Sequence, residues 1–236
     1  MKILVINPNT SEEMTEGIYR SAIAAKQEST EITAVNPPHG PECVEGTSDE
    51  LAAAYHVMEV VKKAEKEADY DAYVVACFGD PGVDAIRELT DKPVVGVAES
   101  AILMSEFISG KFAIISILPR CLVHLEEMVH KYGAEHRVAC IRTPNIGVLD
   151  FHKEPKTAEA KLMNASKAAV EEDYAEAIIL GCAGMSGMAE YVSERVGVPV
   201  LDSVTCAVKM AESLVDIGLK TSKRNTYATP TEKIYK

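Results

Sequence analysis

Tryptophan is absent from this sequence of 236 residues, and only 6% of the residues are aromatic. Basic residues are scarce as well, because 24 lysines and arginines stand against 36 acidic residues, which gives a net charge of -12. Nucleic acids and anionic membranes attract basic surfaces, so we expect neither as a partner. No apolar run approaches the roughly 18 residues of a membrane span, and Asn7-Pro8 comes too early for a secretory signal. The expected location is the cytoplasm, where the six cysteines are expected to be reduced thiols.

The motifs that hold cofactors are also missing. Glycines recur every third residue over 181–187, which is not the G-x-G-x-x-G dinucleotide fingerprint, and no phosphate-loop sequence occurs. The histidines form no H-E-x-x-H pair, and His39, Cys43 and Glu45 lack the spacing of metal ligands. The sequence therefore predicts neither a metal nor an organic cofactor.

Short apolar runs alternate with amphipathic stretches such as 51–68 and 158–172, which predicts an α/β fold with mainly parallel strands. Buried parallel strands are expected to be continuously apolar and rich in β-branched residues. Eight runs fit this description: 3–6, 32–35, 72–76, 94–97, 112–117, 138–141, 177–180 and 198–201.

The chain also repeats itself. Three blocks of the first part return in the same order about 105 residues later: K-I-L-V-I at 2–6 as K-F-A-I-I at 111–115, D-A-Y-V-V-A-C-F-G at 71–79 as E-A-I-I-L-G-C-A-G at 176–184, and P-V at 93–94 as P-V at 199–200. We therefore predict two pseudo-symmetric parallel-sheet α/β domains, one formed by 1–97 plus 207–236 and the other by 98–206. The active site is expected between them, at the carboxyl ends of the strands.

Cys77 and Cys182 hold matched positions in this repeat, each directly after an apolar strand and two residues before a glycine. The repeat predicts that they lie on opposite walls of one cleft. We expect a nearby helix N-terminus to lower their pKa into roughly the 3.5–7.5 range, so that one thiol acts as base and the other as acid. A racemase needs such a pair, because it removes a proton from one face of a carbon and returns one to the other. The remaining thiols are interpreted as small buried apolar side chains: Cys43, Cys121, Cys140 and Cys206.

Two loops are expected at the rim of the cleft. Asn9 and Thr10 follow the first strand and would offer amide and hydroxyl groups to a substrate, although the same residues suit a simple turn and helix cap. Ser116 and Ile117 occupy the repeat-related position in the second half. The loop 39–50 leads into a helix and could fold over the cleft as a lid.

At these residues the chain resembles the hydantoin/allantoin racemase branch of the aspartate/glutamate racemase superfamily. The motifs that carry the resemblance are N-P-N-T-S at 7–11, E-G-x-x-D-E at 45–50, A-C-F-G-D-P-G at 76–82, L-P-R at 118–120, L-G-C-A-G-M at 180–185, and A-V-K-M-x-E-S-L-V followed by G-L-x-T-S-K at 207–223. The resemblance implies a homo-oligomer of two-domain subunits and a two-base mechanism without metal or pyridoxal, using Cys77 and Cys182. Members often carry two hydroxyl residues before L-P-R, whereas here Ser116 is followed by Ile117.

The resemblance also implies which groups hold the substrate. Asn9 and Thr10 would bind ring carbonyls and nitrogens together with the backbone that follows each cysteine, at Phe78 and Gly79 and at Ala183 and Gly184.

The hypothesis is therefore a cofactor-independent racemase of a small-molecule cyclic ureide, either allantoin or a 5-substituted hydantoin. An amino-acid (Asp/Glu) racemase or a maleate-isomerase-type enzyme of the same superfamily is the first alternative. A decarboxylase is disfavoured, because the related arylmalonate enzymes retain a single cysteine and this chain has both. A non-enzymatic module that binds a small molecule is the third reading.

Overall fold

All eight expected strands are present in the computed structural model, which describes residues 1–231. The strands are β1 (Lys2–Ile6), β2 (Glu31–Val35), β3 (Ala72–Val75), β4 (Val94–Gly96), β5 (Phe112–Ile115), β6 (Val138–Arg142), β7 (Ala177–Leu180) and β8 (Val200–Asp202). The largest differences from the expected ends are at β5, where the chain leaves the sheet after Ile115, and at β8, which begins at Val200 instead of 198; β4 ends one residue early because α4 begins at Val97. Within the described residues, no helix has both the length and the apolar character needed to cross a membrane.

Helices connect these strands. They are α1 (Glu12–Ala25), α2 (Thr47–Glu67), α3 (Val83–Leu89), α4 (Val97–Ile108), α5 (Leu122–Lys131), α6 (Asp150–Lys153), α7 (Pro155–Glu171), α8 (Ala189–Val196) and α9 (Ser203–Asp216), with short 3-10 turns η1 (Pro119–Cys121), η2 (Ala183–Met185) and η3 (Asn225–Tyr227). The long helices are amphipathic: α2, for example, buries Ala53, Val57, Val61 and Ala64, which recur at three- and four-residue spacing on one face.

The strands form two separate four-stranded parallel sheets of the same topology, ordered β2-β1-β3-β4 and β6-β5-β7-β8. Adding four to each strand number of the first sheet gives the second, and the pairings of β1 with β3 and of β5 with β7 are both in parallel register. Strands β3, β5 and β7 are buried along their whole length, which explains their unbroken apolar sequence. The prediction of two pseudo-symmetric parallel-sheet α/β domains is confirmed.

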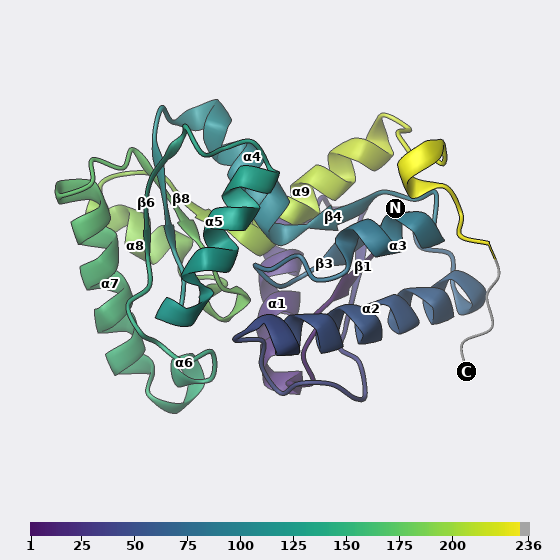
Figure 1. The fold of residues 1–236 in the computed structure, drawn as a ribbon, viewed down its shortest axis with the longest axis horizontal. Coiled ribbons are helices and arrows are strands. Elements are labelled where there is room, and N and C mark those ends of the chain that lie inside the picture. The colour runs from purple at the N-terminus through teal and green to yellow at the C-terminus, as the bar shows by residue number, and fades with distance from the viewer. Residues whose placement is uncertain (232–236) are drawn as a thin grey trace.

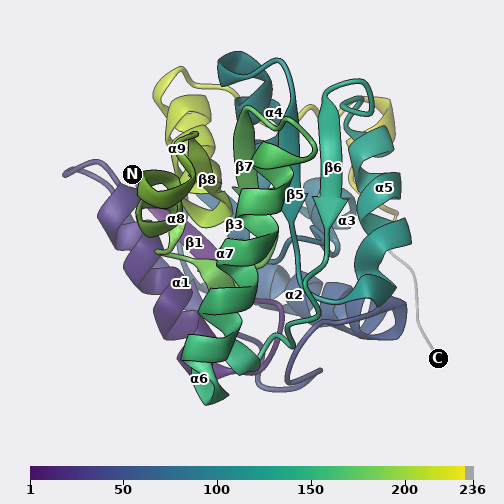
Figure 2. The same cartoon turned by 90° about the vertical axis from the view of Figure 1, so that its left-hand side faces the viewer.

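The two halves interlock through the helix that follows the last strand of each sheet. Helix α4 packs against β7 and β8 of the second sheet, whereas α9 packs against β3 and β4 of the first. The two helices also pack on each other, and they lie side by side between the lobes in Figure 1. Figure 2 looks onto the second lobe, with α7 crossing the near face of its sheet and α5 beside β6. Because each of these helices packs on the sheet of the other half, the carboxyl ends of β3 and β7 lie close to one another between the two sheets.

Candidate active site

A small cavity lies between the two sheets, at the carboxyl ends of their strands. It measures about 50 Å³, several times the roughly 10–15 Å³ that a single water molecule requires. Eight of the ten residues predicted from sequence line it: Asn9, Cys77, Phe78, Gly79, Ser116, Ile117, Cys182 and Ala183. The other two, Thr10 and Gly184, lie beside it. The cavity is thus built from both halves of the chain.

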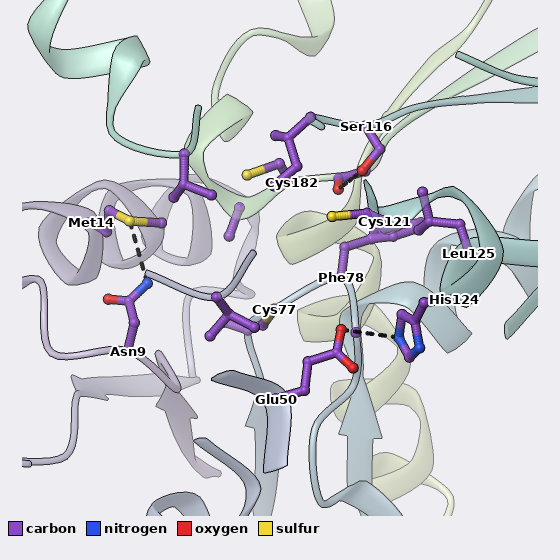
Figure 3. Close-up of a pocket in the computed structure, with 17 residues that line it drawn as sticks. Asn9, Met14, Glu50, Cys77, Phe78, Ser116, Cys121, His124, Leu125 and Cys182 are labelled. Carbon is purple, nitrogen blue, oxygen red and sulfur yellow. Dashed lines mark hydrogen bonds and ion pairs between the residues drawn. The ribbon is translucent and has the colours of Figure 1, made fainter. Parts of the chain in front are cut away.

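The two cysteines enter the cavity from loops of the same form. Cys77 follows β3 and Cys182 follows β7, and Figure 3 shows their side chains on opposite sides of the cavity. The sulfur of Cys182 accepts the backbone N–H of Gly184 at 3.4 Å, and the sulfur of Cys77 accepts the N–H of Gly79. Each thiol therefore has one N–H donor, supplied by the glycine two residues further along the chain.

The prediction of a lowered thiol pKa is wrong. Burial raises the pKa of Cys182 to about 11 and raises that of Cys77 further, and the single N–H bond to each sulfur offsets only part of this. The sequence places a helix directly after each cysteine, but α3 begins at Val83 and α8 at Ala189. Only the one-turn η2 adjoins Cys182, so neither sulfur receives the field of a full helix. The neutral thiol is therefore the favoured form of both groups at pH 7.

Asn9 points an amide donor into the cavity. Its Oδ1 accepts the side-chain N–H of Asn7 at 2.8 Å and the backbone N–H of Ser11 at 2.9 Å, which fixes the orientation of the amide. The Nδ2 atom then faces the cavity, where its partner is the sulfur of Met14 at 3.3 Å (Figure 3). A thioether is a weak acceptor, so this N–H group is available to a ligand carbonyl.

The loop before α2 covers one side of the cavity. Thr10 holds the start of the loop, because its backbone N–H donates to the carbonyl oxygen of Pro41 at 3.0 Å. Glu45 ties the loop to the other half by accepting the N–H of Val148 at 2.9 Å, and Val44 lines the cavity. The substrate contact predicted for Thr10 and the opening of this loop as a lid both remain predictions.

Sequence reasoning missed several residues of the cavity: Met14, Val44, Glu50, Cys121, His124, Leu125 and Val148. Most are apolar, and they leave the cavity with a largely apolar wall. Glu50 and His124 are the exceptions, with Oε1 of the carboxylate 3.2 Å from Nε2 of the imidazole. The position of Glu50 within the motif at 45–50, and of His124 one helical turn after Cys121, are the only signals that could have pointed to them.

The interpretation of the other four thiols as buried apolar groups holds for Cys206 alone, which is 7% exposed. Cys43, Cys121 and Cys140 are only partly buried. Cys121 lines the cavity, and its thiol donates to the carbonyl oxygen of Glu45 at 3.5 Å. Among the side chains that the structure describes, no group of three or more His, Cys, Asp and Glu is placed to hold a metal ion.

Comparison with known proteins gives a consistent picture. The sequence profile of the Asp/Glu/Hydantoin racemase family matches residues 3–211. A hydantoin racemase of Paenarthrobacter aurescens is 53% identical over 100% of both chains. A second, from Pseudomonas sp. (strain NS671), is 48% identical over 100% of this chain and 94% of its own. An allantoin racemase structure from Klebsiella pneumoniae superposes with a TM-score of 0.97 at 39% identity, covering 100% of this chain and 96% of that one.

Proposed function

This chain belongs to the Asp/Glu/Hydantoin racemase family, and we propose that it racemises a five-membered cyclic ureide by proton transfer between Cys77 and Cys182. The observation that carries the proposal is the matched pair of thiols, one from each half, lining a single small cavity. One sulfur, as thiolate, takes the ring proton beside the carbonyl, and the electron pair of the C–H bond moves into that carbonyl. The other sulfur, as thiol, returns a proton to the opposite face.

The N–H groups around the cavity support the anionic intermediate. Asn9 offers its side-chain amide, and the backbone at Gly79 and Gly184 already donates to the two sulfurs. When a sulfur gains the proton, its N–H donor is less strongly held and becomes available to the enolate. A preorganised donor of this kind can contribute on the order of 10²–10³ in rate.

The walls of the cavity favour a hydantoin with a small apolar substituent over allantoin. Met14, Val44, Leu125 and Val148 line the cavity together with Ile117. A ureido substituent buried among these side chains would leave its N–H groups unpaired, at a cost of about 1–3 kcal/mol each.

Free aspartate and glutamate fit the cavity less well. Each carries two carboxylates, and no lysine or arginine lines the cavity among the described residues. The carboxylate of Glu50, which lines the cavity, would repel both of them. The amino-acid alternative therefore has no support from the charges of this site.

The test uses one enantiomer of a 5-alkyl hydantoin in D₂O, followed by polarimetry and NMR. We expect loss of optical rotation together with replacement of the ring hydrogen by deuterium, and slower turnover of allantoin. Cys77→Ala and Cys182→Ala should each lower racemisation by at least about 10³, whereas Cys140→Ala, which alters a thiol outside the cavity, should retain it. Retention of both rotation and ring hydrogen by the wild-type protein, with the ureides and with aspartate, glutamate and maleate, would contradict the proposal.

A further inference from the structure

The two cysteine loops differ in what packs against them. In the repeat, Gly79 and Gly184 hold the same position, each donating its N–H to the sulfur two residues earlier. A Cβ atom built on Gly79 would lie 3.0 Å from Oε1 of Glu50 and 3.5 Å from Nε2 of His124. A Cβ atom on Gly184 would meet the carbonyl oxygen of Val148 at 3.5 Å and the ring of Phe151 at 3.7 Å. The Glu50 carboxylate and the His124 imidazole therefore pack on the first loop, whereas a backbone carbonyl and an aromatic ring pack on the second, with the Glu45 carboxylate one hydrogen bond further away, on the N–H of Val148.

Glu50 and His124 come from opposite halves of the chain. Glu50 lies in the first turn of α2 and His124 in the first turn of α5, and both side chains line the cavity below Phe78 in Figure 3. Their side chains are 21% and 31% exposed, so the carboxylate and the imidazole are partly removed from water. The two groups are in contact at 3.2 Å, but the buried Nε2 atom of His124 makes no geometrically acceptable hydrogen bond to any described residue.

We propose that Glu50 and His124 are positioning residues for Cys77 alone: the pair packs on Gly79, holds its N–H against the Cys77 sulfur, and sets the charge that this sulfur faces. The inference rests on the two-cysteine mechanism proposed above. It adds that proton transfer at Cys77 and proton transfer at Cys182 are controlled by different residues. In a fully symmetric site, the two steps would be chemically identical.

The charges around the pair support this assignment. The Glu50 carboxylate raises the pKa of the Cys77 thiol, and partial burial raises the pKa of Glu50 itself, an effect that His124 opposes. The charged and titratable groups around these side chains and the two thiols are Asp49 on α2, Glu127 on α5, Arg120 and Cys121 in η1, Asp80 in the loop of Cys77, Glu45 before α2, and Cys182 across the cavity. Apart from Arg120, which acts on Cys121, all of these are acidic groups or thiols, so His124 is the basic side chain that contacts Glu50.

Hydrogen exchange in single-cysteine variants separates the two thiols. In Cys182→Ala, the Cys77 thiolate takes the ring proton of one enantiomer, the resulting S–H exchanges with D₂O, and the deuteron returns to the same face without inversion. In Cys77→Ala, Cys182 does the same to the other enantiomer. The dependence of the exchange rate on pH then reports on one sulfur at a time, with both hydantoin enantiomers supplied as probes.

We expect Glu50→Gln to move the exchange profile of the Cys182→Ala protein to lower pH by about one unit, since a neighbouring negative charge is removed. His124→Gln should shift the same profile less than Glu50→Gln does, because it alters the packing on Gly79 and leaves the negative charge in place, and Glu50→Asp, which keeps the carboxylate, should retain most of the wild-type profile. In the Cys77→Ala protein none of these substitutions should shift the profile.

The matched control is Lys131→Gln. Lys131 also lies on α5 and also bridges the halves, with its Nζ 2.7 Å from Asp84, but it does not line the cavity. It should leave both profiles in place. Equal shifts in the two single-cysteine backgrounds, or no shift in either, would overturn the inference. Absence of any exchange in both backgrounds would instead refute the two-cysteine mechanism itself.

Discussion

The loops that carry Cys77 and Cys182 are anchored by carboxylates that come from different places in the two halves. In the first half Asp80, three residues after Cys77, accepts the backbone N–H groups of Ala98 and Glu99 at 3.0 and 2.8 Å, at the start of α4. In the second half the last residue of β8, Asp202, accepts the N–H of Thr205 at the start of α9 and that of Gly187, in the loop after Cys182. Each carboxylate joins a cysteine loop to the first turn of a helix.

The repeat places Gly96 at the position of Asp202. Both residues are N-caps with extended backbone, at φ -86° and ψ 145° for Gly96 and φ -79° and ψ 118° for Asp202. A Cβ atom on Gly96 would lie 2.3 Å from the carboxylate carbon of Asp80. The Asp80 carboxylate therefore occupies the space that the side chain of Asp202 fills in the other half.

Both carboxylates also reach the opposite half of the molecule. Tyr132, at the end of α5, donates its hydroxyl to Asp80 at 2.7 Å, and Ser21 of α1 donates to Asp202 at 3.5 Å. In each half, a carboxylate thus lies where the cysteine loop, the first turn of a helix and a residue of the other half meet. The residue that supplies this carboxylate differs between the halves. Different sequence positions can supply a capping carboxylate, provided that it accepts hydrogen bonds from the N–H groups of the first helical turn.

The largest effect is expected when the first half carries a carboxylate at both positions, residue 80 and residue 96. Gly96→Asp alone should lower the free energy of unfolding by about 4 kcal/mol, because a second carboxylate is driven into the space of Asp80. Combined with Asp80→Ala, the introduced aspartate can cap α4 as Asp202 caps α9, so about half of the stability should return. Urea denaturation of the two single variants, the double variant and the wild type measures this coupling.

Gly17→Asp is the control for that experiment, since a Cβ atom at Gly17 meets nothing within 4 Å. It should remain near wild-type stability. Strictly additive effects of Gly96→Asp and Asp80→Ala would show that the two carboxylates do not occupy equivalent positions.

The second prediction concerns pH, which tests the cost of burying the carboxylate of Asp80. Burial raises the pKa of Asp80 to about 6 from an ordinary 3.8, despite the donors from Glu99, Tyr132 and Ala98. The folded protein therefore binds this proton more tightly than the unfolded chain does. The stabilising contribution is full below about pH 4 and is lost as the pH rises through about 6, amounting to at most about 3 kcal/mol.

Urea denaturation of wild type and Asp80→Asn at pH 4 and pH 7 measures this contribution. The stability of the wild type relative to the variant should increase as the pH falls. Asp84→Asn should behave in the opposite way, because Lys131 and Tyr227 lower the pKa of Asp84 and its contribution is lost on acidification. A wild-type advantage over Asp80→Asn that shrinks on acidification would contradict the buried-carboxylate account.

The sequence predicted the parts of this molecule that depend on local pattern. Cys77 and Cys182 were found through the repeat, and Asn9 and Ser116 through their positions directly after strands. Their placement in one cavity followed because the carboxyl ends of parallel strands meet at a common edge. In each case the prediction needs only the few residues around the site, or their comparison with the matching segment of the repeat.

What the sequence could not predict depends on contacts between the halves. Glu50 and His124 lie on helices far apart in the chain, and only the docking of α2 beside α5 brings them together. The error in the thiol pKa has two physical causes. The turn after Cys77 delays the start of α3 to Val83, and burial within the cavity outweighs the one N–H bond that Gly79 supplies.

The third prediction concerns the ionisation of the thiols, measured through the rate of racemisation. Because burial raises the pKa of Cys182 to about 11 and that of Cys77 further, only a small fraction of either is thiolate at neutral pH. The value of kcat/KM for a 5-alkyl hydantoin, corrected for the uncatalysed reaction, should rise about tenfold per pH unit between pH 6.5 and 8.5. A profile already flat at pH 7 would mean that a thiolate exists before substrate binds.

The smallest effects are expected from the two hydroxyl groups that cross between the halves. Tyr132→Phe removes a short hydrogen bond to a buried carboxylate and should cost about 1.5 kcal/mol of unfolding free energy. Ser21→Ala removes a contact of 3.5 Å to Asp202, at the outer limit of hydrogen-bond geometry, and should cost less than about 0.5 kcal/mol. Urea denaturation at pH 7 resolves the two values.

Because Tyr132 holds the pKa of Asp80 down, Tyr132→Phe should also move the acid-side stability change of the second prediction to higher pH, whereas Ser21→Ala should not. Equal costs for the two substitutions would show that the hydrogen bond to Asp202 stabilises the contact between the halves as much as the hydrogen bond to Asp80 does. The two loops would then differ in the residue that supplies the carboxylate, and not in the strength of its contact with the other half.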